Sequence, residues 1–195
     1  MNIALGLTLS RIFLSPVFLV IYLYHVQLGI SFIVLPFILI GLVVLAELTD
    51  LFDGLAARKR GEVTELGKLL DPMADSIFRL SVFLALTQGV INLPLWLVLF
   101  FFYRDSVISL LRTVCALRGF TLAARFSGKV KAVVQACSAL VILVLMIPYA
   151  FGFLSLAVLQ STSFYIVLGA VVYSLFSGAE YLKANQSYIK KALVK

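Results

Sequence analysis

The sequence carries very little charge. Only 13% of its 195 residues are Asp, Glu, Lys or Arg, whereas a soluble domain usually has about 25%. Three long stretches, 12–46, 80–103 and 132–179, contain no charged residue. These stretches are too long for buried core helices, and each is long enough for one or two membrane spans. We therefore expect an integral membrane protein rather than a soluble domain.

Histidine and cysteine are also scarce. The one histidine, His25, lies in a predicted connection away from the acidic residues, where an interfacial position is expected. The two cysteines, Cys115 and Cys137, have no second pair that would complete a metal-binding spacing. They fall within the membrane or on its cytoplasmic side, where disulfides are rare. Packing roles are expected for both.

Turn-forming residues divide the apolar pattern into helix-length segments. They lie at Leu28-Gly29, between Gly89 and Pro94, and around Pro148 and Gly152. Since a spanning helix needs roughly 20 mainly apolar residues, the sequence predicts an all-α, polytopic membrane protein with six transmembrane helices. The predicted spans are 9–26, 32–57, 71–89, 94–117, 129–149 and 154–182. Because no linker separates further units, a single membrane domain is expected over 1–195.

The positions of Lys and Arg predict the orientation of these spans. All 16 lie at the N-terminal end, in the connections after the second and fourth spans, in the C-terminal tail, or within a few turns of these. Positive residues stay on the cytoplasmic side, so both termini are expected there, in a multi-pass protein of the cell membrane. The net charge of +7 then faces an anionic leaflet. Nucleic acid is not expected as a partner, because the basic residues flank spans.

Four aspartates stand out in this apolar chain: Asp50, Asp53, Asp71 and Asp75. Ionisable groups near hydrocarbon are costly and mark functional sites. Helical spacings of three and four place each pair on one face, and a predicted connection over 59–71 would bring the pairs together. Converging carboxylates repel one another unless cations intervene, and oxygen ligands without His or Cys favour Mg²⁺, Mn²⁺ or Ca²⁺. The pattern predicts a metal site that could hold a diphosphate.

Small and basic residues accompany the aspartates. Gly54, Ala57 and Gly67 would leave room for a bulky headgroup beside the backbone. Arg58 lies one turn after Asp53-Gly54, and its planar guanidinium suits a phosphate oxygen. A binding site for a phosphorylated headgroup is therefore expected next to the metal.

The alternative is that the aspartates form salt bridges at helix ends, with Arg58, Lys59 or Lys68. That reading suits a single aspartate better than a fixed pattern of small and acidic residues across two spans. Glu47 lies one turn before Asp50. It is interpreted as a supporting or helix-pairing residue and placed outside the site.

The residues from Asp50 to Asp75 match D-x-x-D-G-x-x-A-R-x8-G-x3-D-x3-D at all eight defined positions, and so the chain resembles the CDP-alcohol phosphatidyltransferases. The resemblance implies six helices around a cytoplasm-facing polar cavity, and a homodimer. It implies Mg²⁺ or Mn²⁺ bound by the four aspartates, with Asp75 also taking the proton from the acceptor hydroxyl. Thr8 and Arg11 would lie near the nucleotide entrance. The residues expected to bind CDP are Thr8, Asp50, Asp53, Gly54, Ala57, Arg58 and Gly67.

Charges on the fourth and fifth predicted spans point to the acceptor. Arg104, Asp105 and Arg112 lie in otherwise apolar sequence, where charges face inward or pair. Arg104 and Asp105 are neighbours, so they are expected to face different directions and not to form one simple pair. Several cations facing the cavity imply a negatively charged acceptor, such as a phosphorylated polyol. Other basic residues could instead mark only the lipid surface: Arg118, Arg125 and Lys131.

Three further segments are similar to segments of the bacterial phosphatidylglycerophosphate synthases of this family. They are L-T-x-x-R from Leu7 with Pro16, R-D…L-R…G…G-K-x-K from Arg104 to Lys131, and S-G-x-E-Y from Ser177. They imply transfer of a phosphatidyl group from CDP-diacylglycerol to sn-glycerol 3-phosphate, giving phosphatidylglycerophosphate and CMP. The residues expected at the acceptor phosphate are Arg104, Arg112, Lys129 and Lys131.

Two positions depart from the family pattern. Leu5 stands where Asn is common, and Ser76 stands where Lys or Arg usually follows the last aspartate. They leave open other acceptors, namely inositol phosphate, or phosphatidylglycerol as in a cardiolipin synthase. A small cation-coupled transporter is the alternative from a different class. Against it, the aspartates lie at one side of the membrane and no inverted repeat is evident.

Overall fold

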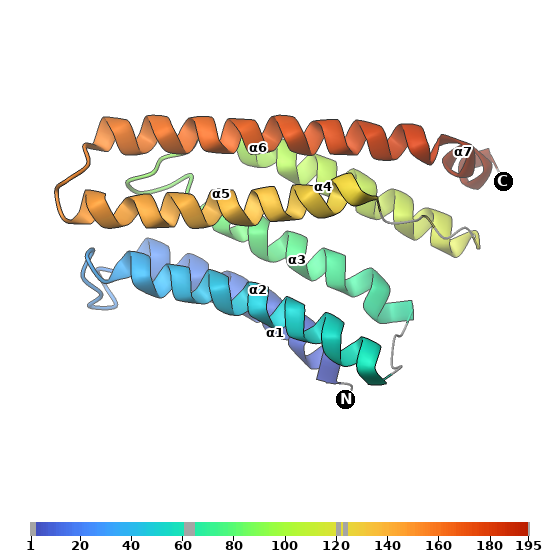
Figure 1. Cartoon of the computed structure of the whole chain (residues 1–195), viewed down its shortest axis with the longest axis horizontal. Coiled ribbons are helices and arrows are strands. Elements are labelled where there is room, and N and C mark those ends of the chain that lie inside the picture. Colours follow the sequence, from blue (N-terminus) through green and yellow to red (C-terminus); the bar gives the residue numbers. More distant parts are fainter. Residues whose placement is uncertain (1–2, 61–64, 120–121, 123–124, 195) are drawn as a thin grey trace. The chain divides into compact units, whose positions relative to one another are not determined.

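The computed structural model of the chain is built from helices (Figure 1). It describes residues 3–60, 65–119, 122 and 125–194, and the side chains that lie within 10–49 and 72–190 of these. The helices are α1 (Ile3–Tyr24), α2 (Leu35–Arg60), α3 (Glu65–Ala85), α4 (Leu95–Leu117), α5 (Phe126–Ala150), α6 (Leu156–Ala184) and α7 (Gln186–Val194). The described residues contain no strand, which confirms the predicted all-α class.

The first six helices correspond to the six predicted spans. The chain turns where the sequence places glycine: Gly89 follows α3 with φ of 67°, and Gly152 follows α5 with φ of 77°. Glycine adopts this left-handed backbone without the steric cost that a side chain would add. Two helices, α5 and α6, are long and apolar enough to cross a membrane, while α1 and α2 contain the shorter apolar segments Ser10–Tyr24 and Leu35–Thr49.

The predicted connection between Lys59 and Asp71 is wrong. α2 continues to Arg60 and α3 begins at Glu65, so Asp71 lies inside α3 rather than at its start. Charged residues end an apolar run, but Lys, Arg and Glu are good helix formers, so these helices continue beyond their hydrophobic segments. The short helix α7 was missed for the same reason, because it is not a long apolar run.

The chain divides into two compact units, and the first comprises Met1–Leu93 with Ala139–Ser163. In this unit α1 packs against both α2 and α3 (Figure 1). Phe18 of α1 meets Phe78 of α3 edge to face, with ring centroids 6.4 Å apart. The Tyr22 hydroxyl donates a hydrogen bond of 2.9 Å to the carbonyl oxygen of Gln88. Apolar packing and this bond fix α1 relative to α3.

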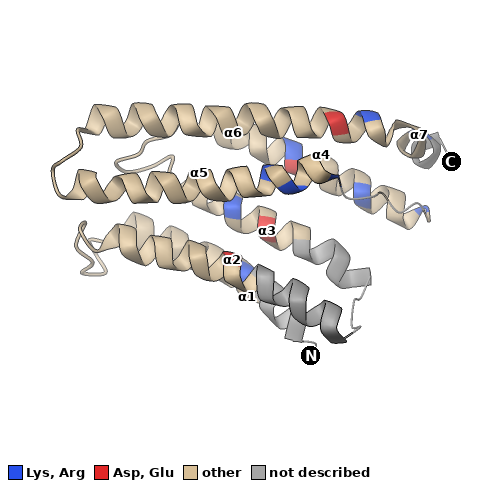
Figure 2. Cartoon of the chain, in the orientation of Figure 1, with Lys and Arg blue, Asp and Glu red and all other residues tan. Residues whose placement is uncertain are grey.

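The second unit comprises Pro94–Ser138 with Phe164–Lys195. It contains α4, the first half of α5, most of α6, and α7, which packs against α4. Leu97, Phe101 and Val167 are fully buried in it. The charged residues of α4 lie in its middle and second half, and those of α5 lie near its beginning, as Figure 2 shows. Each of the two units thus combines an apolar core with a limited charged region.

Candidate active site

The four aspartates lie on two helices, as the spacing predicted. Asp50 and Asp53 belong to α2, and Asp71 and Asp75 belong to α3. Of the four side chains, the structure describes that of Asp75. The other three lie outside the described residues, as do the remaining predicted CDP-binding side chains: Thr8, Gly54, Ala57, Arg58 and Gly67. Their roles stay predictions.

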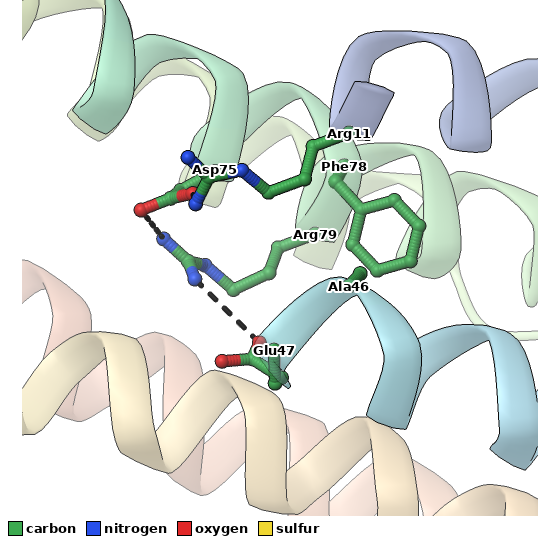
Figure 3. Close-up of a pocket in the computed structure, with 6 residues that line it drawn as sticks. All are labelled: Arg11, Ala46, Glu47, Asp75, Phe78 and Arg79. Carbon is green, nitrogen blue, oxygen red and sulfur yellow. Dashed lines mark hydrogen bonds and ion pairs between the residues drawn. The ribbon is translucent and has the colours of Figure 1, made fainter. Parts of the chain in front are cut away.

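Asp75 lies within a group of charged side chains from three helices, which we call the Asp75 cluster: Arg11, Glu47, Asp75 and Arg79 (Figure 3). The guanidinium of Arg11, from α1, forms a close ion pair and hydrogen bond with Oδ1 of Asp75. Arg79, one turn after Asp75 on α3, places Nη2 4.0 Å from Oδ2. The two carboxylate oxygens therefore meet two different cations.

Glu47 of α2 completes the Asp75 cluster. Its Oε1 lies 3.8 Å from Nη1 of Arg79, so the Arg79 guanidinium lies between two carboxylates (Figure 3). Ala46 and Phe78 line the same small pocket. The four charged residues sum to zero formal charge. Such balance matters because Arg11 is 1% exposed, and a buried charge without a partner is strongly destabilising.

The donor chemistry of the aspartates suits a hard divalent cation. An ionised carboxylate has about four lone-pair sites, so Asp75 can accept from Arg11 and still offer oxygen to another partner. Oxygen ligands are those that Mg²⁺ and Mn²⁺ prefer. Within the described residues no three His, Cys, Asp or Glu side chains form a possible metal site. Three of the predicted ligands lie outside that part of the chain.

The second unit contains another charged group, the Asp105 cluster: Arg104, Asp105, Lys131 and Ser177. Nζ of Lys131 lies 2.8 and 3.0 Å from the two carboxylate oxygens of Asp105. Arg104 donates from Nη1 to Oδ1 of Asp105 and from Nη2 to the Ser177 hydroxyl, each at 3.0 Å. The side chains of Arg104, Asp105 and Lys131 are all at least nine-tenths buried, and their formal charges sum to +1.

One expectation for this region is wrong, and one alternative is excluded. Arg104 and Asp105 do form a pair, because the long Arg104 side chain reaches back to its neighbour although their Cβ atoms point apart. Lys131 does not lie at a lipid surface, because it is buried against Asp105. Gly178 makes the path of Arg104 possible, since a Cβ at position 178 would lie 3.2 Å from Arg104 Cγ. Arg104 thus lies against the backbone of α6.

The other two predicted phosphate-binding residues differ in setting. Arg112 donates from Nε to the Tyr181 hydroxyl at 3.2 Å, and its guanidinium carbon lies 5.3 Å from the centre of the Tyr181 ring. Lys129, in the first turn of α5, is exposed. Arg125 is exposed and pairs with Glu180 at 3.3 Å. Arg112 is therefore held in place, while Lys129 is accessible.

The sequence interpretation missed Arg79 and excluded Glu47. One signal was present: Arg79 follows Asp75 by four residues, which places them on the same helix face. It also follows Ser76, the position without the expected basic residue, by three. Ser177 and Tyr181 appeared only as part of a resemblance. Their contacts with Arg104 and Arg112 depend on how α4 and α6 pack, which spacing does not specify.

Comparisons with known proteins agree with the chemistry of these residues. The family model of the CDP-alcohol phosphatidyltransferases matches residues 1–176. A CDP-diacylglycerol–glycerol-3-phosphate 3-phosphatidyltransferase of Bacillus subtilis is 30% identical over 97% of each chain. A protein of the same name from Rickettsia typhi is 30% identical over 96% of this chain and 98% of its own. A cardiolipin synthase (CMP-forming) of Streptomyces coelicolor is 36% identical over 39% of this chain and 35% of its own.

The family match includes the aspartate pattern, the Asp75 cluster and all of the Asp105 cluster except Ser177, which lies one residue beyond it. The chain's carboxylate and guanidinium groups and its apolar helices are those expected for a membrane enzyme that acts on a phosphorylated headgroup. The chain belongs to the CDP-alcohol phosphatidyltransferase family.

Proposed function

We propose that this enzyme transfers a phosphatidyl group from CDP-diacylglycerol to sn-glycerol 3-phosphate, giving phosphatidylglycerophosphate and CMP in phospholipid synthesis. The observation that carries the proposal is the 30% identity, over 97% of both chains, to the Bacillus subtilis enzyme named for that transfer. The complete aspartate pattern from Asp50 to Asp75 supports the same chemistry.

In the proposed reaction, an acceptor hydroxyl oxygen attacks the phosphorus of the phosphatidyl group. The bond from that phosphorus to the oxygen shared with CMP breaks, and its electron pair leaves with CMP. The hydroxyl proton passes to an oxygen of Asp75, which acts as general base. Arg11 and Arg79 contact Asp75 from two directions, so they are suited to keep its carboxylate in place.

A divalent ion, Mg²⁺ or Mn²⁺, would neutralise charge on the diphosphate and polarise the phosphorus when bound. We propose Asp50, Asp53, Asp71 and Asp75 as its ligands. Thr8, Gly54, Ala57, Arg58 and Gly67 are proposed, with Asp50 and Asp53, to bind the CDP group. Positioning and charge neutralisation provide most of the acceleration in phosphoryl transfers, and these residues would supply both.

The acceptor phosphate is proposed to bind among Arg104, Arg112, Lys129 and Lys131. The Asp105 cluster has a net charge of +1 and its cationic donors are held in place by Asp105, which favours an anionic ligand. The Nε atom of Arg104 is buried and has no hydrogen-bond partner among the described residues. Lys129 is exposed and could meet the ligand first. A neutral alcohol would gain nothing from this excess of positive charge.

The family and the apolar helices α5 and α6 indicate a membrane protein. We propose that all six long helices span the cell membrane as one domain, with both termini and the active site cytoplasmic. Large apolar side chains on their outer faces, such as Phe13, Val172 and Phe176, are exposed and suit contact with lipid or with a second copy in a homodimer. The charge distribution of the sequence supports this orientation.

Phosphatidylglycerol is the second candidate acceptor, because the Streptomyces coelicolor relative is a cardiolipin synthase (CMP-forming). That similarity covers 39% of the chain, whereas the glycerol-3-phosphate relatives cover nearly all of it. A transporter is not favoured, because the family is one of transferases.

The test is CMP release by the purified full chain in detergent, with CDP-diacylglycerol and Mg²⁺. Glycerol 3-phosphate, inositol phosphate and phosphatidylglycerol would be compared as acceptors, and Asp75→Asn prepared in parallel would control for contaminating activity. Release with glycerol 3-phosphate alone is expected, with phosphatidylglycerophosphate identified by mass spectrometry. Release only with another acceptor would contradict the proposed acceptor, and no release with any of them would contradict the proposed reaction.

A further inference from the structure

Arg79 is a charged residue that the aspartate pattern does not include, yet it touches the predicted base. It lies on α3, and 13% of its side-chain surface is exposed. One end nitrogen lies 4.0 Å from Asp75 and the other lies 3.8 Å from Glu47 (Figure 3). Its Nε is buried and has no hydrogen-bond partner in the described part of the chain. Burying a cation costs desolvation free energy, so the position of Arg79 calls for a functional reason.

The orientation of a carboxylate is not fixed by the chain itself. The last torsion of an aspartate joins sp³ and sp² atoms and has a broad, roughly twofold preference. External contacts must therefore select one orientation of the Asp75 carboxylate. Arg11 of α1 meets Oδ1, and Arg79 of α3 meets Oδ2. With both oxygens engaged from different directions, rotation of the carboxylate is opposed.

Glu47 acts on the opposite side of Arg79. It comes from α2, so the ion pair of Glu47 with Arg79 joins α2 to α3 next to Asp75. Both contacts of Arg79 are longer than hydrogen bonds, which means that charge attraction rather than direct bonding holds them. Because Arg79 and Asp75 are mostly buried, solvent screens this attraction less than it screens a surface pair. The attraction keeps the Arg79 guanidinium on the Oδ2 side of Asp75, opposite the contact of Arg11 with Oδ1.

We propose that Arg79 is a positioning residue for the acceptor base Asp75, and that Glu47 holds Arg79 in the orientation required. The proposal rests on the proposed function, because it needs Asp75 to receive the acceptor proton. It assigns Arg79 no contact with substrate. Arg79 therefore affects the rate of the chemical step and leaves substrate binding unchanged.

The experiment compares Arg79→Gln, Arg79→Lys, Glu47→Gln and the double variant Glu47→Gln/Arg79→Gln with the wild type. The purified full chains are assayed in detergent for kcat and for the KM of each substrate, and CMP binding and the thermal unfolding midpoint are measured alongside. Arg125→Gln is the matched control, because it removes an ion-paired arginine outside both charged clusters. Wild-type turnover with glycerol 3-phosphate tests the proposed function in the same assay.

Arg79→Gln is expected to lower kcat by about tenfold to a hundredfold, the effect of a small misplacement of a reacting group. Each KM, CMP binding and the unfolding midpoint should stay close to wild type, and Arg79→Lys should recover part of kcat. Glu47→Gln should cause a smaller loss. Because Glu47 acts through Arg79, the double variant should be no slower than Arg79→Gln. The effects of substituting two residues in contact do not simply add.

Several results would overturn the inference. With an active wild type, an unchanged kcat in Arg79→Gln would remove the positioning role and leave the proposed function intact. A raised KM or weaker CMP binding at unchanged kcat would make Arg79 a binding residue instead. If Arg79→Gln does not fold, Arg79→Lys and Glu47→Gln decide, and full activity in both would reject the proposal. An inactive wild type would contradict the proposed function and the inference with it.

Discussion

The Asp75 cluster and the Asp105 cluster each place an aspartate between two cations, but among the described side chains they differ in their fourth member. In the Asp75 cluster Glu47 adds a second negative charge, and the sum over the four residues is zero. In the Asp105 cluster the further partner is the neutral hydroxyl of Ser177, and the sum is +1. A balanced group can accept an added cation with further carboxylates, whereas a positive group favours an anion. Two clusters of similar residues therefore suit ligands of opposite charge.

Of the changes considered, metal removal should have the largest effect on activity, and it should act on the region of Asp75 rather than on that of Asp105. A chelator such as EDTA is expected to abolish CMP release, because the proposed divalent ion would neutralise charge on the diphosphate and polarise the phosphorus. Added Mg²⁺ or Mn²⁺ should restore activity, measured as CMP release against free metal concentration. Full turnover in chelator, with metal content checked by elemental analysis, would argue against a metal site at the aspartates.

Asp75→Asn should have the next largest effect. We expect kcat to fall by a factor of about 10² to 10⁴, the usual contribution of a general base. The amide keeps the shape of the side chain but cannot take the proton. Binding of CDP-diacylglycerol, followed by displacement of a labelled nucleotide, should be largely retained. Full activity in this variant would show that another group accepts the proton.

Asp105→Ala tests the second cluster. Removing this carboxylate leaves Arg104 and Lys131 buried without their shared partner, and breaking a buried pair costs about 3–5 kcal/mol. The loss should appear in the free energy of unfolding in mild detergent. The double variant Asp105→Leu/Lys131→Met removes Asp105 and one of its two buried cations and leaves Arg104, so it should recover part of the lost stability while the KM for glycerol 3-phosphate rises. Recovery of stability with an unchanged KM would exclude Lys131 from the acceptor site.

The smallest effect is expected at Arg112 and Tyr181. Tyr181→Phe removes one hydrogen bond to Arg112 but keeps the ring beside the guanidinium. The free energy of unfolding is therefore expected to fall by about 1 kcal/mol. If Arg112 binds the acceptor phosphate, this variant should raise the KM for glycerol 3-phosphate several-fold and leave kcat unchanged. Arg112→Gln should raise that KM further. Equal KM values in both variants and the wild type would leave Arg112 with a structural role alone.

Much of the fold could be predicted from the sequence because two signals coincide in it. Charge is absent from the long apolar stretches, and glycines such as Gly89 and Gly152 end them. The prediction failed between Lys59 and Asp71, where helices continue in polar sequence. Hydrophobicity reports where a helix could be buried in lipid, whereas helix formation also follows backbone propensity.

The candidate site was predictable where it depends on spacing along one helix. Asp71 and Asp75 lie on α3 as expected. The pairing of Asp75 with Arg79, one turn later, follows the same spacing but was overlooked. Contacts between helices were not predictable, because they depend on the rotation of each helix about its axis. Glu47 with Arg79 is one such contact. The pairing of Arg104 with Asp105 was mispredicted because Cβ directions do not limit a long, flexible side chain.

Gly178 has a consequence for where a positive charge resides. Long basic side chains near membranes tend to extend toward the headgroups, so that the charged end stays in water. At position 178 the missing side chain leaves room for the Arg104 stem, whose Cγ lies 3.2 Å from where a Cβ would be. The guanidinium is thereby directed inward to Ser177 and Asp105 instead of outward to the solvent. A glycine at this position therefore favours an internal site for a charge that a membrane protein would otherwise keep at its surface.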